Sequence, residues 1–152
     1  MITISKSPTA DTRSCDRTQV SKEQLLQSSA EHIGDVARGL AMFATLLEDA
    51  GESHDHDKIE LIDGFHEEFK GGFKTDAWLK NHYRVNRHHL AADGGLHSDV
   101  NLVDVPEYIV DCVMAGMARS GHVRKLELSS SILQKAFRNT VNLMHENVEV
   151  AE

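Results

Sequence analysis

The chain has 152 residues, ten of them histidine, and a formal net charge of −8 at pH 7. A chain of this length is typical of one domain that buries its own core, so folding requires neither a metal ion nor a disulfide. The negative charge disfavours binding along a nucleic-acid polymer, whereas small phosphorylated molecules remain suitable ligands.

The composition favours helices, because Gly, Pro and aromatic residues are few and Leu, Ala, Glu and Lys are common. We therefore expect an all-α protein with about five main helices. Residues 1–20 are predicted to be a flexible arm, residues 21–147 a single helical domain, and residues 148–152 a tail.

The sequence also predicts a cytoplasmic protein. The segment Met1–Lys6 lacks the apolar stretch of a signal peptide, and no apolar run approaches the length that spans a membrane. Cys15 lies in the polar arm and Cys112 in an apolar segment, so a structural disulfide is not expected.

The first helix is predicted to begin at Ser21, which forms a capping-box pattern with Gln24, and to end at Asp49-Ala50-Gly51. Leu25, Val36 and Leu40 recur along it at helical spacing and predict a buried stripe that also carries His32. A second helix is predicted from His54 to Phe69.

The third helix is predicted to start at a Thr75 cap and to continue through His89, because Trp78, His82, Val85 and His89 share one helical face. The fourth follows Asp104, with Pro106 in its first turn, and ends at Gly121. The fifth spans approximately Leu128 to Asn147.

Three segments carry the residues with the clearest chemical potential. His54 and Asp55 offer a divalent ion two ligands from one short stretch, and Lys58, one turn later, can neutralise phosphate charge. Asp111 lies in a helix that is apolar on nearly every side, where an ionised carboxylate requires a cation or hydrogen bonds. The alternatives are a core histidine for His32, a solvated cap for His54 and Asp55, and a helix cap or an arginine partner for Asp111.

A second cluster consists of His82, His88 and His89, which are compatible with a transition-metal site or a second metal. On a continuous helix His89 shares the face of His82 and His88 turns away, whereas a break at Asn86 reverses that expectation. Asn86 can hold an imidazole tautomer or contact a substrate hydroxyl. The alternative is an exposed, histidine-rich helix end without a ligand.

The order of a helix histidine, a His-Asp pair and a late aspartate resembles the HD-domain metal-dependent phosphohydrolases. His32, His54, Asp55 and Asp111 match that order. More narrowly, the segments 54–58, 78–82, 86–89 and 108–111 look like small phage and prophage proteins of the same superfamily. The Gly-Tyr-Pro of the related cyclic-dinucleotide phosphodiesterases does not follow His88-His89.

The resemblance implies an HD-like helical bundle that holds one or two divalent ions (Mn, Fe, Co, Ni, Zn or Mg). The implied metal ligands are His32, His54, Asp55 and Asp111, with His82, His88 and His89 as ligands of a second metal or contacts to substrate. Asp55 and Lys58 are the expected catalytic residues. Asn86, Arg84 and Arg87 are the expected substrate contacts.

The expected function is therefore that of a phosphohydrolase of small nucleotides, above all a nucleoside monophosphate phosphatase. The alternatives are a phosphodiesterase of cyclic or linear nucleotides and a non-catalytic helical binding protein, of the phage counter-defence type, that retains the HD scaffold. The expected partner is a small phosphorylated substrate, a homodimer is left open, and a phage-encoded chain would act in the host cytoplasm.

Overall fold

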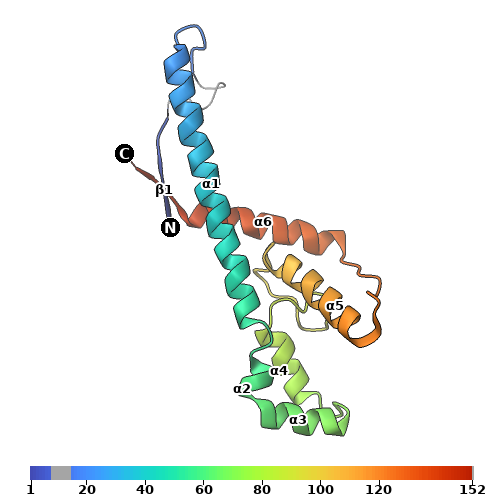
Figure 1. Cartoon of the computed structure of the whole chain (residues 1–152). Helices are drawn as coiled ribbons and strands as arrows, with labels where there is room; N and C mark the ends of the chain where they lie inside the picture. The colour runs from blue at the N-terminus through green and yellow to red at the C-terminus, as the bar shows by residue number, and fades with distance from the viewer. Residues whose placement is uncertain (8–14, 152) are drawn as a thin grey trace. The chain divides into compact units, whose positions relative to one another are not determined.

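The computed structural model describes residues 1–7 and 15–151 (Figure 1). Helices dominate this part of the chain, which confirms the predicted all-α fold class. The elements in chain order are β1 (Ile2–Ser5), α1 (Lys22–Ser53), α2 (Asp57–Glu60), α3 (Ile62–Gly71), α4 (Ala77–Val85), α5 (Asp104–Ser120), α6 (Ser130–Glu146) and β2 (Val148–Ala151). The chain divides into two compact units: unit 1 comprises Met1–Thr45 and Asn142–Glu152, and unit 2 comprises Leu46–Val141.

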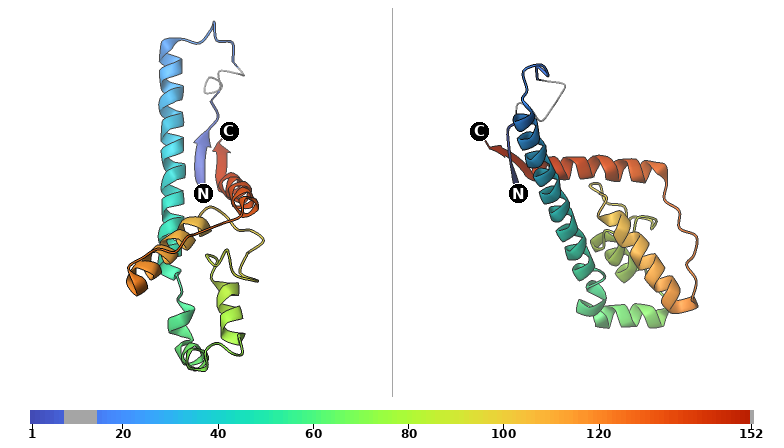
Figure 2. Two further views of the ribbon diagram at one scale, coloured as in Figure 1. Left: turned by 90° about the vertical axis from the view of Figure 1, so that its right-hand side faces the viewer. Right: turned by 45° about the horizontal axis from the view of Figure 1, so that its top comes forward.

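In unit 1, β1 and β2 pair as a two-stranded parallel sheet in which Ile2 is in register with Val148 (Figure 2). This sheet was not predicted, since the N-terminal arm and the C-terminal tail were expected to have no regular structure. Ile2 and Ile4 alternate with polar residues, as do Val148 and Val150, which is the period of a strand. Four residues are too few for that period to stand out from a sequence. Residues 8–14 of the predicted arm lie outside the described residues.

α1 begins with the predicted capping box. The backbone N–H of Ser21 donates to Gln24 Oε1 (2.9 Å), and the backbone N–H of Gln24 donates to Ser21 Oγ (3.1 Å). The helix continues through Gly51, where it was expected to stop, and ends at Ser53. Gly51 does not adopt the left-handed conformation with which a glycine ends a helix.

The apolar stripe of α1 is not buried as predicted, because Leu25, Val36 and Leu40 are all exposed. His32, which was expected on that stripe, is exposed as well. None of the described helices, α1 included, combines the length and the apolar character that crossing a membrane requires.

The core of unit 2 lies where the segment before α5 meets α6. Leu90, Val100, Val105 and Ala136 form its buried centre, and Leu102, Tyr108 and Leu128 pack against them. Side chains of α6 also hold this segment. Asn139 Nδ2 donates to the Val100 carbonyl (2.7 Å), and Thr140 Oγ1 accepts from the Leu102 N–H (2.7 Å).

The prediction of one continuous second helix from His54 to Phe69 is wrong. The residues 54–56 form a turn, and the remainder is divided into α2 and α3 at Leu61, which has non-helical φ and ψ values of −111° and 36°. Aromatic side chains join α3 to the next helix: the ring of Phe65 stacks on that of Trp78 at 4.4 Å.

The predicted third helix is shorter than expected at both ends. α4 begins after Asp76, whose φ is positive, and Thr75 donates to Glu68 instead of capping the helix. α4 ends at Val85 because Asn86 is extended (φ −99°, ψ 109°). His88 and His89 therefore lie beyond the helix.

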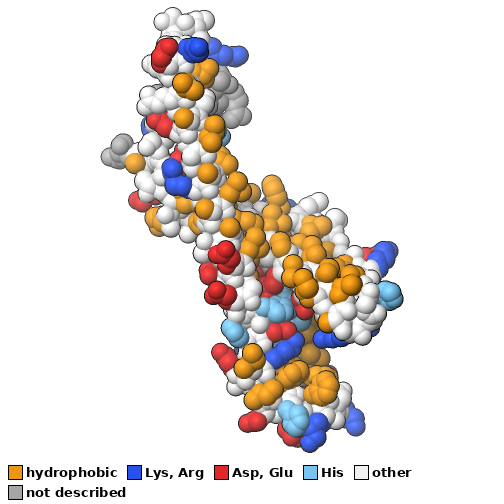
Figure 3. All heavy atoms as spheres, viewed as in Figure 1, with side chains coloured by type: hydrophobic (Ala, Val, Ile, Leu, Met, Phe, Trp, Pro, Cys, Tyr) orange, Lys and Arg blue, Asp and Glu red, His pale blue; other side chains and the backbone are white. Residues whose placement is uncertain are grey.

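The predicted fourth helix is confirmed as α5, which ends at a left-handed Gly121, and the predicted fifth corresponds to α6. α5 was expected to be buried on all sides, but Ile109, Val110, Met114 and Met117 are exposed. Exposed hydrophobic side chains are visible over this helix in Figure 3. Only the face that meets the core of unit 2 is covered.

Gly95 packs closely against the backbone of His89 in the loop after α4. We predict that Gly95→Ala destabilises unit 2. A Cβ at Gly95 would lie 2.3 Å from the His89 carbonyl oxygen, so the backbone has to move. Forced packing of this kind lowers the free energy of unfolding by about 1–3 kcal/mol.

Gly71→Ala is the matched control, since a Cβ there meets nothing within 4 Å. It should change the free energy of unfolding by less than about 0.5 kcal/mol. Urea denaturation of the two variants measures the difference. Equal stability of Gly95→Ala and the wild type would contradict the close approach.

Candidate metal centre

The turn between α1 and α2 places His54 and Asp55. Asp55 has a φ of 54°, a left-handed conformation that few residues other than glycine adopt but that aspartate tolerates. The backbone N–H of Lys58 donates to the Asp55 carbonyl (2.9 Å), which closes the turn. Such backbone conformations occur often at functional sites, where surrounding contacts hold them.

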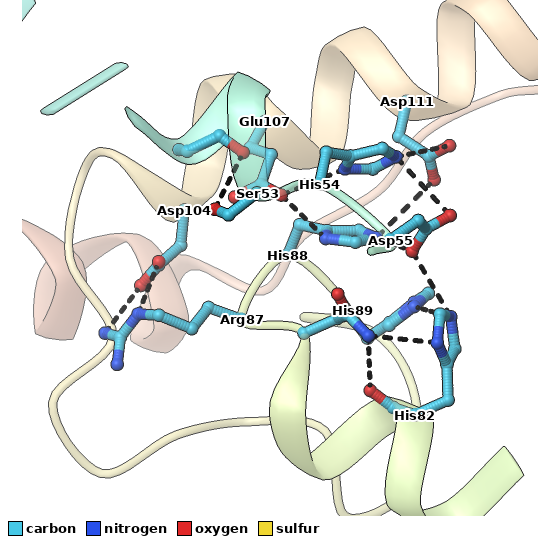
Figure 4. A network of polar contacts seen from close by, with 12 residues as sticks. Ser53, His54, Asp55, His82, Arg87, His88, His89, Asp104, Glu107 and Asp111 are labelled. Carbon is cyan, nitrogen blue, oxygen red and sulfur yellow. Dashed lines mark hydrogen bonds and ion pairs between the residues drawn. The ribbon is translucent and has the colours of Figure 1, made fainter. Parts of the chain in front are cut away.

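A first ligand group consists of His54, His88 and Asp111, which come from the turn, the loop after α4, and α5. One potential ligand atom from each residue lies within 4.8 Å of the others. His54 Nε2 is 3.7 Å from Asp111 Oδ1, and His88 Nε2 is 4.0 Å from Asp111 Oδ2. Figure 4 shows these side chains pointing toward one another.

A second ligand group consists of Asp55, His82 and His89, with ligand atoms again within 4.8 Å of one another. His82 Nε2 lies 3.4 Å from Asp55 Oδ1 and 2.7 Å from His89 Nε2. Burial and the neighbouring His88 and His82 lower the pKa of His89 to about 3, so its ring is neutral near pH 7. A neutral imidazole is the form that binds a metal ion.

Asp55, a member of the second group, also contacts both histidines of the first group. Its Oδ2 is 3.5 Å from His54 Nε2, and its Oδ1 is 3.6 Å from His88 Nε2, in addition to the contact with His82. Asp55 Oδ1 and His88 Nε2 are both buried without a hydrogen-bond partner. Buried polar atoms without a partner are rare, and a cation shared by the carboxylate and the imidazole would satisfy both.

The break at Asn86 explains why His88 and His89 lie in different ligand groups. On a continuous helix only one of them would share the face of His82. In the loop that follows α4, His88 joins the first ligand group and His89 the second. The sequence predicted that one of the two histidines, His88 or His89, would face the site, whereas in the structure each belongs to a ligand group of its own.

Glu107 orients the first ligand group and was not predicted. His54 Nδ1 lies 3.0 Å from Glu107 Oε1 in a hydrogen bond, and His88 Nδ1 lies 2.9 Å from the same oxygen in an ion-pair contact. Burial raises the pKa of Glu107, but its contacts with His88 and His54 outweigh that effect and leave the pKa below its ordinary value. With Nδ1 directed at Glu107, each imidazole has Nε2 left for a metal ion.

Asp57 has the same role in the second ligand group. His82 Nδ1 donates to Asp57 Oδ2 (2.9 Å), which leaves Nε2 as the lone-pair nitrogen. Asn86 Nδ2 donates to Asp57 Oδ1 (2.9 Å) and to the His82 carbonyl (3.0 Å). Both N–H bonds of Asn86 are thus engaged, and Asn86 holds the Asp57 carboxylate that contacts the His82 ring.

The charge of the site is strongly negative. Four carboxylates meet the histidines of the two groups: Asp55, Asp57, Glu107 and Asp111. Lys58, which forms a salt bridge with Asp55, is the one Lys or Arg among the described residues to pair with any of them. Burial raises the pKa of Asp55, but the hydrogen bond and charge of Lys58 outweigh that effect and leave the pKa below its ordinary value. Asp55 is therefore ionised at neutral pH. Such an excess of negative charge favours bound cations.

Several predicted site residues lie elsewhere. His32 belongs to unit 1, is exposed, and is in neither ligand group. Arg84 is exposed and donates to Asn81, while Arg87 is held by Asp104 and Asp99 and fixes the start of α5.

Asp111 is in the first group but is less buried than expected, with 29% of its side chain exposed. The reason is that α5 is covered on one face only.

The chain matches no protein-family model, no curated protein and no solved structure.

We predict that Glu107→Gln weakens metal binding at the first ligand group by about 10- to 100-fold, because the amide no longer holds the two imidazoles as a carboxylate does. Competition with a chelator measures this loss. Glu60→Gln, an exposed position on α2, is the matched control and should bind metal as the wild type does.

Trp78 provides an independent signal for the second ligand group. It is the single tryptophan of the chain, and its ring stacks on His82 at 4.7 Å. Its fluorescence should respond to metal in both the wild type and Glu107→Gln. If Glu107→Gln lost the fluorescence response as well as the metal affinity measured by chelator competition, the assignment of Glu107 to the first group would be contradicted.

Proposed function

We propose that the chain is a metal-dependent hydrolase of small phosphomonoesters, with nucleoside monophosphates as the expected substrate class. The buried atoms Asp55 Oδ1 and His88 Nε2, which have no hydrogen-bond partner and lie among six candidate ligands, carry the proposal. The donor set of imidazole nitrogens and carboxylate oxygens suits a transition-metal ion. The resemblance to the HD-domain phosphohydrolases supports the same reaction.

The reaction is the hydrolysis of a phosphate ester. An oxygen of water forms a bond to phosphorus, and the ester P–O bond breaks with its electron pair remaining on the leaving oxygen. That oxygen takes up a proton from the water, so the products are an alcohol and inorganic phosphate. Bound divalent ions would polarise a phosphoryl oxygen and lower the pKa of water toward neutrality.

The residues of the chain would divide the remaining work. Asp55 connects the two ligand groups, so both depend on the turn that it forms. Glu107 and Asp57 fix the imidazole rings before substrate arrives, which reduces reorganisation during the reaction.

Lys58 is the residue with which the chain itself would stabilise the phosphate. Its side chain is 34% exposed while its Nζ contacts Asp55, so it combines access to substrate with a position at the ligand groups. A fixed cation at this place stabilises the charge that develops on the phosphoryl oxygens. Arg84 and Arg87, the other predicted helpers, are engaged elsewhere.

We predict that Lys58→Gln keeps its bound metal and lowers kcat by about 10²-fold or more, as the loss of a charge-stabilising group does. Asp55→Asn should lose both metal and activity. Phosphate release from ribo- and deoxyribonucleoside mono-, di- and triphosphates measures activity, and metal content is determined on the same samples. Lys70→Gln, an exposed position in α3, is the control.

Absence of phosphate release from the whole panel with Mn, Fe, Co, Ni, Zn and Mg would overturn the enzymatic proposal. Metal binding without turnover would then favour the helical binding protein. Cleavage of a cyclic or linear diester, with no release from monoesters, would favour a phosphodiesterase instead.

A further inference from the structure

A cavity of about 420 Å³ in unit 2 adjoins the first ligand group. Leu47 from the end of α1 and Pro106, Val110 and Met114 from α5 form its apolar walls. His54 and Asp111, two members of the first ligand group, line the same cavity. Its volume lies in the range of about 300–1,000 Å³ that is typical of pockets for small molecules.

The cavity is polar where it meets the ligand group and apolar elsewhere. Histidine and acidic side chains gather beside hydrophobic ones in this part of the surface (Figure 3). A molecule with an anionic group at the metal centre would therefore place its other end against Leu47, Val110 and Met114. Contact with these side chains favours an uncharged, apolar body.

The charges of the cavity restrict the occupant further. Glu107 and Asp111 are the acidic residues that line it, and the described residues of its lining include neither Lys nor Arg. A second phosphate group extending into the cavity would face two carboxylates without a compensating cation. The cavity thus suits a molecule with one phosphate and disfavours diphosphates and triphosphates.

We propose that this cavity binds the leaving group of the substrate, and that the substrate class is monophosphates with an uncharged, apolar body, such as an aromatic ring. The inference rests on the proposed function, because a metal-bound phosphoryl group at His54 and Asp111 sets the position of that ring. An aromatic ring can belong to a nucleobase or to a simpler aryl group, and both satisfy the apolar walls.

Calorimetric binding of phosphonates, which are not hydrolysed, tests the cavity separately from catalysis. Metal-loaded protein should bind benzylphosphonate at least about tenfold more tightly than methylphosphonate, because burial of the ring adds more than 1.4 kcal/mol. In the double variant Val110→Asn, Met114→Gln this preference should fall to about twofold or less. Both side chains are more than half exposed, so the variant is expected to fold.

Met117→Gln is the matched control, because Met117 is an exposed methionine of α5 that does not line the cavity. It should retain the full preference for benzylphosphonate. The methylenephosphonate analogue of adenosine 5′-monophosphate, which is not hydrolysed, distinguishes the two sources of the ring. Binding that is tight and sensitive to the double substitution indicates a nucleobase, whereas binding no tighter than that of methylphosphonate indicates a smaller aryl group.

Two results would overturn the inference in different ways. Equal binding of benzylphosphonate and methylphosphonate would contradict the cavity as a leaving-group site and leave the proposed function intact. If the metal-loaded protein bound neither phosphonate, that result would contradict a phosphoryl-binding site at the ligand groups. Both the proposed function and this inference would then fail.

Discussion

The excess of carboxylate charge around a cluster of partly buried histidines is the constraint on which the site depends. Asp55, Asp57, Glu107 and Asp111 lie close to four imidazoles and one lysine. Carboxylates gathered around one cluster of side chains repel one another unless cations separate them. Glu107 and Asp57 each contact imidazole Nδ1 atoms, and Lys58 offsets the charge of one carboxylate, Asp55. The Nε2 atoms of the histidines lie close to Asp55 and Asp111 instead.

Two local backbone conformations bring the candidate ligands of the site together. The left-handed conformation at Asp55 ends the long α1 and starts α2, so His54 and Asp55 can serve different ligand groups although they are neighbours in the sequence. The extended conformation at Asn86 does the same for His88 and His89. Two breaks in helical structure, one before α2 and one after α4, thus distribute two pairs of adjacent residues over two ligand groups. The core of unit 2 and the Arg87–Asp104 salt bridge hold the loop that carries the second pair.

Much of the site was visible in the sequence, because His, Asp and Lys at close spacing are conspicuous residue types. His54, Asp55, Asp111 and the histidines at 82, 88 and 89 were all candidates, and the structure brings them together. Glu107 lies one helical turn before Asp111, a spacing that could have identified it, whereas nothing local distinguished Asp57 from a helix cap. His32 was misplaced because an apolar stripe predicts burial only if another element covers it, and that stripe is exposed. The breaks at Asp55 and Asn86 follow from tertiary contacts that propensity does not encode. The metal and the reaction remain predictions.

A crystal structure determined with Mn²⁺, using its anomalous scattering, tests the central claim most directly. The account predicts two anomalous peaks separated by about 3.5–4 Å, as in two-metal hydrolytic sites. One peak should lie among His54, His88 and Asp111, the other between His82 and His89, and both within bonding distance of the Asp55 carboxylate. Peaks confined to surface carboxylates, or no peak near Asp55 in protein saturated with Mn²⁺, would contradict it.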